Sequence, residues 1–303
     1  MTLTIYNKIS ILQLAFFVPS LVVAVTLSYR HGFRRSAGWI YLVILSLMRI
    51  IGASLELATI SSPDNYNLVV GAQTLQNIGL SPLVLVLLGL VTRSYLAVPE
   101  SSRPAIPNAR ILRQLQLLVV VGLILSIVGG TDMGNQVGDG IADGTAISYN
   151  IPSTSKAGIA IMIVGYALLV LSSLVLVTCL GAIPHGEKRL LMAVFAALPF
   201  VFVRLLYSVL SAFDSSNPNF RLYGGSSNAG YYVLGMCTVM EIVAVIIFEV
   251  VGLTLPYVPH NERGSLLNPT RRTANLDING QPLTEYPASN SQEYPKLQQG
   301  ESA

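Results

Sequence analysis

Charged residues are scarce in this chain. Only 11% of its 303 residues are Asp, Glu, Lys or Arg and 52% are apolar, whereas about a quarter of an ordinary soluble domain is charged. Long stretches carry no charge at all, and the segment after residue 254 carries many. The formal net charge of +3 is therefore no sign of a nucleic-acid partner, and we expect none. The composition is that of a membrane protein.

Cysteine and histidine are also rare. Cys179 and Cys237 lie inside apolar stretches rather than in loops, so no structural disulfide is expected. Neither cysteine has a Cys or His neighbour at metal-ligand spacing, and we predict that His31, His185 and His260 lie in loops or in the C-terminal tail. The sequence thus predicts no metal site, no cofactor and no catalytic residue.

Long apolar runs dominate the remaining sequence. A helix needs about 20 mostly apolar residues to cross a hydrocarbon layer about 30 Å thick, and lipid leaves no other open structure with its backbone groups satisfied. The fold class that we predict is all-α, a polytopic transmembrane bundle of seven helices within residues 1–254. The predicted spans are approximately 9–29, 38–60, 68–92, 111–130, 157–180, 190–213 and 230–253.

The positions of Lys and Arg predict the orientation, because short cytoplasmic loops carry the excess of these residues. One set of loops is rich in arginine, from Arg30 to Arg35, from Arg93 to Arg113 and at Arg189, whereas the other set holds only Lys8, Lys156 and Arg221. We therefore predict that the N-terminus lies outside and the C-terminus in the cytoplasm. Plasma membrane and endomembrane stay open alternatives.

Two polar segments lie outside the predicted spans. The stretch from Thr131 to Lys156 is rich in Gly and Asp and predicts a flexible outer connection, without the ligand spacing of a calcium loop. Residues 255–303 have few large apolar side chains, so we predict a disordered cytoplasmic tail. Within it, Tyr294 to Leu297 resembles the Tyr-x-x-hydrophobic signals of trafficking adaptors, although matches this short are common by chance.

Three landmarks repeat at a nearly constant offset. His31-Gly32 corresponds to His185-Gly186, Arg49-Ile50-Ile51 to Arg204-Leu205-Leu206, and Ser61-Ser62-Pro63 to Ser216-Asn217-Pro218. The offsets favour a parallel repeat of three helices, a linking fourth and three more. The alternative is that apolar sequences resemble one another by chance.

Five strongly ionisable side chains lie well inside the predicted spans: Arg49, Glu56, Arg204, Glu241 and Glu249. A charge near the helix centre costs about 2.5 to 3.5 kcal/mol on insertion scales, so these groups should face one another or water. The rise of about 1.5 Å per residue places Arg49 and Glu241 near the midplane and Arg204 further outward. We predict that Arg49 pairs with Glu241, and Arg204 with Glu56 or Glu241.

Helical spacing places these charges on polar stripes. Ser46, Arg49, Gly52, Ala53 and Glu56 recur at steps of three and four residues, and similar stripes follow from the third, sixth and seventh spans. One hypothesis is an outward-opening ligand site; the other is that the polar groups only hold the helices together. Pro19, Pro82 and Pro199 are predicted to kink their helices in either case. The candidate ligand-binding residues are Arg49, Glu56, Gln73, Gln76, Asn77, Arg204, Tyr207 and Glu241.

Several runs of residues resemble a known family. These runs are Arg30-His31-Gly32-Phe33, Arg49-Ile50-Ile51-Gly52-Ala53, Gly79-Leu80-Ser81-Pro82-Leu83 and Val203-Arg204-Leu205-Leu206-Tyr207-Ser208. They are similar to a fungal family of seven-helix integral membrane proteins of unassigned function, sometimes encoded near secondary-metabolite genes. The resemblance covers the membrane region and excludes the tail. A more distant similarity to fungal lipid-translocating exporters concerns architecture alone.

Three classes of function remain open. Charged groups near the midplane and the suggested repeat favour transport or handling of a small or lipid-like molecule. Seven spans with basic inner loops suit a receptor or sensor, but no cysteine is placed for an outer-loop disulfide and the seventh span lacks an Asn-Pro-x-x-Tyr motif. A membrane-embedded enzyme comes third, with Glu56 or Glu241 as the only candidate acid.

Overall fold

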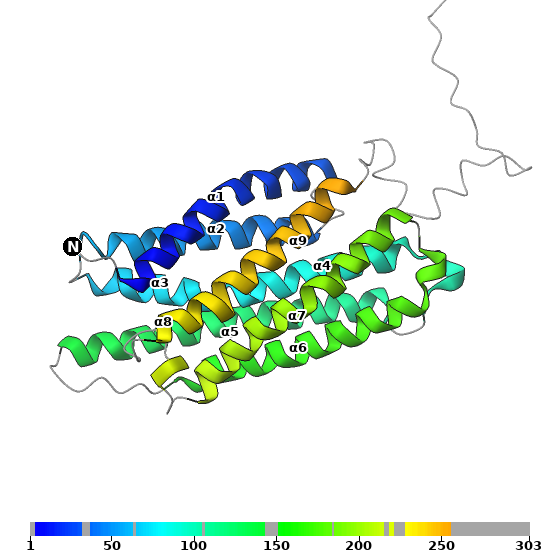
Figure 1. Ribbon diagram of the computed structural model, residues 1–303. Helices are drawn as coiled ribbons and strands as arrows, with labels where there is room; N and C mark the ends of the chain where they lie inside the picture. The colour runs from blue at the N-terminus through cyan, green and yellow to red at the C-terminus, as the bar shows by residue number, and fades with distance from the viewer. Residues whose placement is uncertain are drawn as a thin grey trace, which may run out of the picture. The chain divides into compact units, whose positions relative to one another are not determined.

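The computed structural model describes residues 4–31, 37–62, 65–104, 107–142, 151–183, 185–214, 218–220 and 228–255. All described helices belong to one compact unit, Met1–Tyr257, and run side by side along a common direction (Figure 1). The predicted tail lies beyond this part of the chain, with Tyr294 and Leu297 in it, so its disorder and its adaptor signal stay predictions.

Within the described residues, seven helical spans are long and apolar enough to cross a membrane, as the sequence predicts. Five are single helices: α1 (Ile5–His31), α2 (Ala37–Ala58), α5 (Ala109–Ala142), α6 (Ser153–Thr178) and α7 (His185–Phe213). The third consists of α3 (Tyr66–Ile78) and α4 (Leu80–Ala97), and the seventh of α8 (Ala229–Tyr232), the π-helix η4 (Val233–Val239) and α9 (Met240–Thr254). Short 3-10 helices are η1 (Glu100–Ser102), η2 (Leu180–Ala182) and η3 (Pro218–Phe220).

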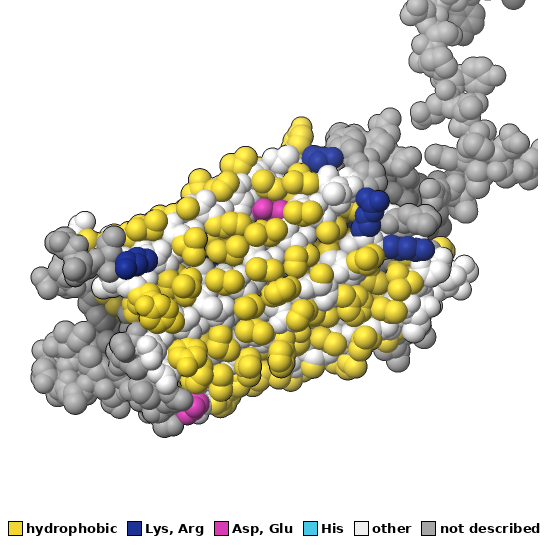
Figure 2. Space-filling model, in the orientation of Figure 1, with side chains coloured by type: hydrophobic (Ala, Val, Ile, Leu, Met, Phe, Trp, Pro, Cys, Tyr) yellow, Lys and Arg dark blue, Asp and Glu magenta, His cyan; other side chains and the backbone are white. Residues whose placement is uncertain are grey.

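The outer surface of the bundle is apolar. Val22, Leu117 and Met192 expose 65%, 60% and 68% of their surface, and Figure 2 shows a continuous hydrophobic band with Lys and Arg confined to its two ends. Soluble monomers rarely expose contiguous apolar patches of more than a few hundred Å². With seven spans of sufficient length, this surface makes the chain a multi-pass membrane protein whose band faces lipid.

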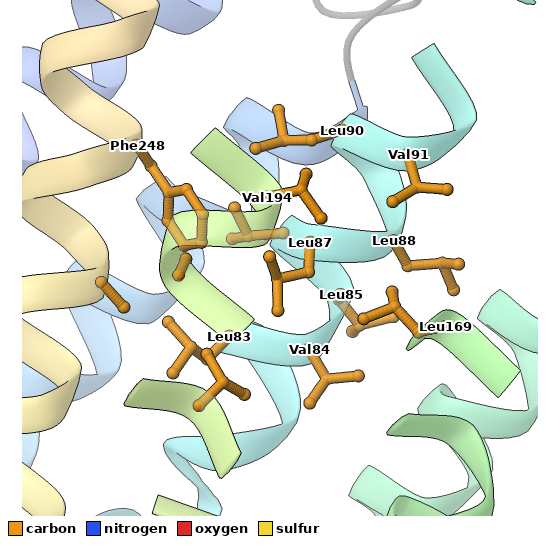
Figure 3. Packing of buried hydrophobic residues seen from close by; sticks show 14 of the residues in the cluster. Leu83, Val84, Leu85, Leu87, Leu88, Leu90, Val91, Leu169, Val194 and Phe248 are labelled. Carbon is orange, nitrogen blue, oxygen red and sulfur yellow. The ribbon is translucent and has the colours of Figure 1, made fainter. Parts of the chain in front are cut away.

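Helix α4 is the central element of the bundle. The most apolar window of the third span is 88% buried, against 22% for the fourth span, and every residue from 80 to 88 is buried. In Figure 3, Leu83 and Leu87 point toward Phe248 of α9 and Val194 of α7, while Leu88 points toward Leu169 of α6. A helix that is apolar on all sides belongs in the interior, so α4 fills the centre with close-packed hydrocarbon.

Two predictions of loop structure are wrong. Helix α5 continues to Ala142, so residues 131–142 of the predicted outer connection are helical; once a helix is nucleated, each further residue adds a hydrogen bond at little cost. His31 is the buried last residue of α1, with Nε2 3.2 Å from the carbonyl oxygen of Gly252 and its ring stacked on Trp39. His185 is the first residue of α7 rather than part of a loop.

In the suggested repeat, α1, α2 and α3–α4 correspond to α6, α7 and α8–α9. Helix α2 packs on α4 as α7 packs on α9, and α1 packs on α9 as α6 packs on α4. Such exchanged pairs are expected where two copies are related by an axis along the membrane normal. The end of the bundle at which α1, α3 and α8 begin is called the N-terminal end below (Figure 1).

Candidate functional site

The predicted pair of Arg49 and Glu241 forms in the bundle interior. Arg49 of α2 donates from Nε to Oε1 of Glu241 at 2.6 Å, and its Nη2 donates to Oε2. The two side chains are 2% and 1% exposed. This two-pronged contact joins the second span to the seventh, and it satisfies both charges away from water.

Gln76 of α3 joins this pair to the sixth span. Its side-chain Oε1 accepts from Nη1 of Arg49 at 2.6 Å. Its backbone carbonyl oxygen accepts from Nη1 of Arg49 at 3.3 Å and from Nη2 of Arg204 at 3.2 Å. Arg49 and Arg204 are equivalent residues of the suggested repeat, and they meet at one carbonyl group.

The interruption of the third span explains why this carbonyl is available. Gln76 lies among the last four residues of α3, whose carbonyl groups lack regular partners within the helix. Pro82, in the first turn of α4, has no N–H to offer the carbonyl of Ile78 four residues earlier. The sequence predicts a kink at Pro82, and the structure places the helix break at Gly79, just before it.

Gly79 makes room for Arg49. A Cβ atom at this position would overlap the Arg49 guanidinium group. The backbone of Gly79 is in the ordinary right-handed helical region, so the need for glycine here comes from space and not from conformation. A larger residue would displace the guanidinium from Glu241 and Gln76.

The first span contributes a residue that the sequence reading missed. Gln13 of α1 is 1% exposed, and its Nε2 lies 3.3 Å from Oε1 of Gln76 and 3.3 Å from Oγ1 of Thr238. A single amide, followed along the span by a long apolar run, is the signal that could have identified it. The polar network, defined as Gln13, Arg49, Gln76, Arg204, Thr238 and Glu241, thus draws on five of the seven spans.

The seventh span is irregular beside the network. Thr238 lies in the π-helix η4 and Glu241 in the first turn of α9. π-Helical segments inside α-helices are rare and occur frequently at functional sites. In the suggested repeat, an offset of 155 makes position 234, inside η4, the counterpart of Gly79.

The prediction for Arg204 is wrong. Within the described residues Arg204 forms no ion pair with Glu56 or Glu241; its Nη1 donates to Oγ of Ser208 at 2.7 Å and its Nη2 to the Gln76 carbonyl. Glu241 has both oxygens engaged by Arg49, and Glu56 lies two helical turns from Arg49 toward the N-terminal end. Helical spacing alone predicts how deep Arg204, Glu56 and Glu241 lie in the bundle, but not which neighbouring helix each side chain faces.

The other predicted residues lie around the network. Glu56 is 8% exposed and takes part in an interaction of its own, and Tyr207 is 2% exposed in α7. The side chains of Gln73 and Asn77 lie outside the described residues, although their backbones belong to α3. Glu249 accepts a hydrogen bond from Ser20 at 2.5 Å, two turns of α9 beyond Glu241. Within the described residues no three His, Cys, Asp or Glu side chains cluster as metal ligands.

The match to a protein family covers the whole membrane region. Residues 3–258 match the family described as a domain of unknown function, DUF7702. The chain belongs to the DUF7702 family. No curated protein and no solved structure matches it. The polar network and every described helix lie within the part that matches the family. Because the family has no known function, any function must be inferred from the site.

Proposed function

We propose that this member of the DUF7702 family transports or otherwise handles a small or lipid-like molecule, which it binds at the polar network. The observation that carries the proposal is the meeting of two arginines, one glutamate and two glutamines from five spans at interrupted helices. In the third span Gln76 precedes α4, so the network lies on the N-terminal-end side of the packed apolar core of that helix.

The energetics favour a functional network over structural contacts alone. Each charged residue costs about 2.5 to 3.5 kcal/mol to place near the helix centre, while an interhelical hydrogen bond in a membrane returns about 0.6 kcal/mol on average. Well-packed apolar side chains would therefore hold these helices together at lower cost. The presence of Arg49, Arg204 and Glu241 in the interior therefore supports a ligand site.

The interrupted spans favour transport within this class. Broken helices near the midplane form substrate sites in many transporters, where one repeat moves against the other. In this chain the break at Gly79 and the π-helix η4 lie at corresponding positions of the two suggested copies. These two points are the natural hinges for such a movement, since fewer regular backbone hydrogen bonds resist bending there.

A receptor or sensor is the second candidate. The half of the bundle away from the N-terminal end is closed by Leu83, Leu87, Val194 and Phe248, all fully buried (Figure 3). A ligand bound at the polar network would have no open way past this core. A protein that only senses such a ligand needs no second opening, whereas a transporter must separate these side chains during its cycle.

A deletion strain separates these functions. Lipids and small molecules are profiled in cells and in medium, with and without the gene. We expect the deletion to shift a molecule between cell and medium, which is the result of lost transport. Loss of a product would indicate an enzyme instead, and an unchanged distribution would indicate sensing.

Complementation connects the phenotype to the network. The strain receives the wild-type gene, the double variant Arg49→Met with Glu241→Met, or the control Arg93→Gln, which alters an arginine paired with Glu187 outside the network. Wild type and control should restore the distribution, and the double variant should not, at equal abundance in the membrane. Full restoration by the double variant would show that the network serves only to join helices.

The proposal also covers the orientation of the protein in the membrane and the kind of organism it comes from. We propose that the N-terminal end faces outward, so that the network is reached from outside or from the outer leaflet, and that the tail is cytoplasmic. The distribution of Lys and Arg in the loops supports this orientation. A fungal origin rests on the resemblance of the membrane-region motifs.

A further inference from the structure

Arg204 is a buried cation whose hydrogen-bond acceptors, among the residues that the structure describes, are all neutral. It is 2% exposed, and its two terminal nitrogens donate to the hydroxyl of Ser208 and to the carbonyl of Gln76. Its Nε has no hydrogen-bond partner within the described part of the chain. A guanidinium group normally offers its nitrogens as a fork to a carboxylate or phosphate, and here one of these nitrogens, Nε, is unused.

The charges of the polar network do not balance. Arg49 and Glu241 neutralise each other, which leaves the positive charge of Arg204 uncompensated among the six network residues. An unpaired charge in the interior is costly, and truncating one partner of a buried pair costs about 3 to 5 kcal/mol for this reason. The network therefore has the charge of a site that awaits an anion.

Tyr207 places a second donor on the same side of α7. It lies three residues after Arg204, a spacing that puts two side chains on one helix face. Tyr207 is 2% exposed, and its hydroxyl has no hydrogen-bond partner among the described residues. A buried hydroxyl without a partner is uncommon and calls for an explanation, and a bound oxyanion would accept from it.

The surroundings of Tyr207 are apolar. Its ring belongs to a cluster with Ile9, Val233 and Cys237 at the N-terminal end of the bundle, separate from the main core. The ring of Phe220 lies 6.3 Å from that of Tyr207. A strongly hydrated small anion gains nothing from such contacts, whereas the chain of an amphiphile would pack against them.

We propose that Arg204 and Tyr207 bind the oxyanion head, carboxylate or phosphate, of an amphiphilic molecule. This assignment rests on the proposed function and names the chemical class of its ligand. Arg204 supplies the charge and its free Nε edge, Tyr207 donates its hydroxyl, and the cluster around Tyr207 holds the adjoining hydrocarbon. The head group completes the charge balance of the network.

Binding is measured with the full-length protein in nanodiscs of a neutral galactolipid, which carries neither phosphate nor carboxylate. Retention of radiolabelled laurate is compared with empty nanodiscs, and competitors of different head group are then added. Dodecanol and dodecylamine have the same chain without an anion, inorganic phosphate has an anion without a chain, and phosphatidic acid has both. We expect phosphatidic acid and unlabelled laurate to compete at concentrations at least tenfold lower than the other three.

Variants test the two residues. Arg204→Met should weaken laurate retention at least tenfold, while Arg204→Lys, which keeps the charge but loses the Nε donor, should weaken it less than Arg204→Met does. Tyr207→Phe keeps the ring packing and removes only the hydroxyl, so it remains informative if an Arg204 variant does not fold; we expect it to weaken retention about threefold. Arg93→Gln removes an arginine that has a carboxylate partner at the other end and should change nothing.

The thermal midpoint separates binding from a structural role. Because Arg204→Met removes an uncompensated charge, we expect the ligand-free midpoint to stay equal or rise, which a residue that only joins helices would not allow. Equal competition by dodecanol and laurate, or unchanged retention in both Arg204→Met and Tyr207→Phe, would overturn the anion site and leave a ligand site of other chemistry. Competition by inorganic phosphate as strong as by laurate would overturn the amphiphile assignment. Failure of every amphiphile to bind would count against the proposed function as well.

Discussion

A double-mutant cycle on Arg49 and Glu241 tests the physical basis of the network. The cycle comprises Arg49→Met, Glu241→Met and the double variant, with methionine chosen because its flexible chain fills irregular space. Each single variant leaves one buried charge without its partner, since both side chains are at most 2% exposed. The double variant leaves neither charge.

The expected magnitudes follow from these contacts. Removing one partner of a buried pair costs about 3 to 5 kcal/mol, and at about 2 to 4 °C per kcal/mol for a domain of this size the midpoint should fall by roughly 6 to 20 °C. In the double variant Gln76 loses a donor to its Oε1 but keeps Gln13 at 3.3 Å, a loss of about 1 kcal/mol. The double variant should therefore be much more stable than either single variant.

The assay is thermal unfolding in detergent at one scan rate, followed by fluorescence. Trp39 is the single tryptophan of the chain and is fully buried, so its emission reports loss of the packed state. Single variants within about 3 °C of wild type, or a double variant that loses the sum of both single losses, would refute the reasoning. Either result would mean that water or another group already compensates the two charges.

Three further predictions concern two particular contacts and the orientation in the membrane. Gly79→Ala should lower the free energy of unfolding by about 1 to 3 kcal/mol because the added Cβ overlaps Arg49. Gly235→Ala, with nothing within 4 Å of its added Cβ, should not have this effect. Equal losses in the two variants would contradict the packing around Gly79. Arg93→Gln should cost less than about 1 kcal/mol in the same unfolding assay, since its pair with Glu187 is partly exposed. Cysteine labelling of sealed vesicles at positions 139 and 294 should report opposite sides of the membrane; labelling from one side at both would contradict the proposed orientation.

The sequence was sufficient for the membrane architecture. Lipid admits helices of a minimum length, so seven apolar runs translate directly into seven spans. The depth of Arg49 and Glu241 follows from the constant rise of a helix, and the structure confirms their pairing. The stripe from Ser46 to Glu56 is likewise buried, because the helical period fixes which residues share a face.

Side-chain direction between helices could not be obtained in this way. Arg204 has a suitable depth for Glu241, yet both oxygens of that carboxylate belong to Arg49. Gln13 escaped notice because a lone amide in an apolar run has no periodicity to mark it. The helical extension of α5 to Ala142 went unpredicted because Gly and Asp residues ordinarily favour turns.

What the sequence determined by itself is the solvent of this protein and the number and depth of its spans, because hydrophobicity and helical rise are local properties. What only the tertiary structure decided is which polar groups meet: the break at Gly79 opens a carbonyl to two arginines, and one of them, Arg204, has no counter-charge among the described residues. Those contacts depend on how five helices are rotated against one another, and rotation is set by packing across the whole bundle rather than by any one segment.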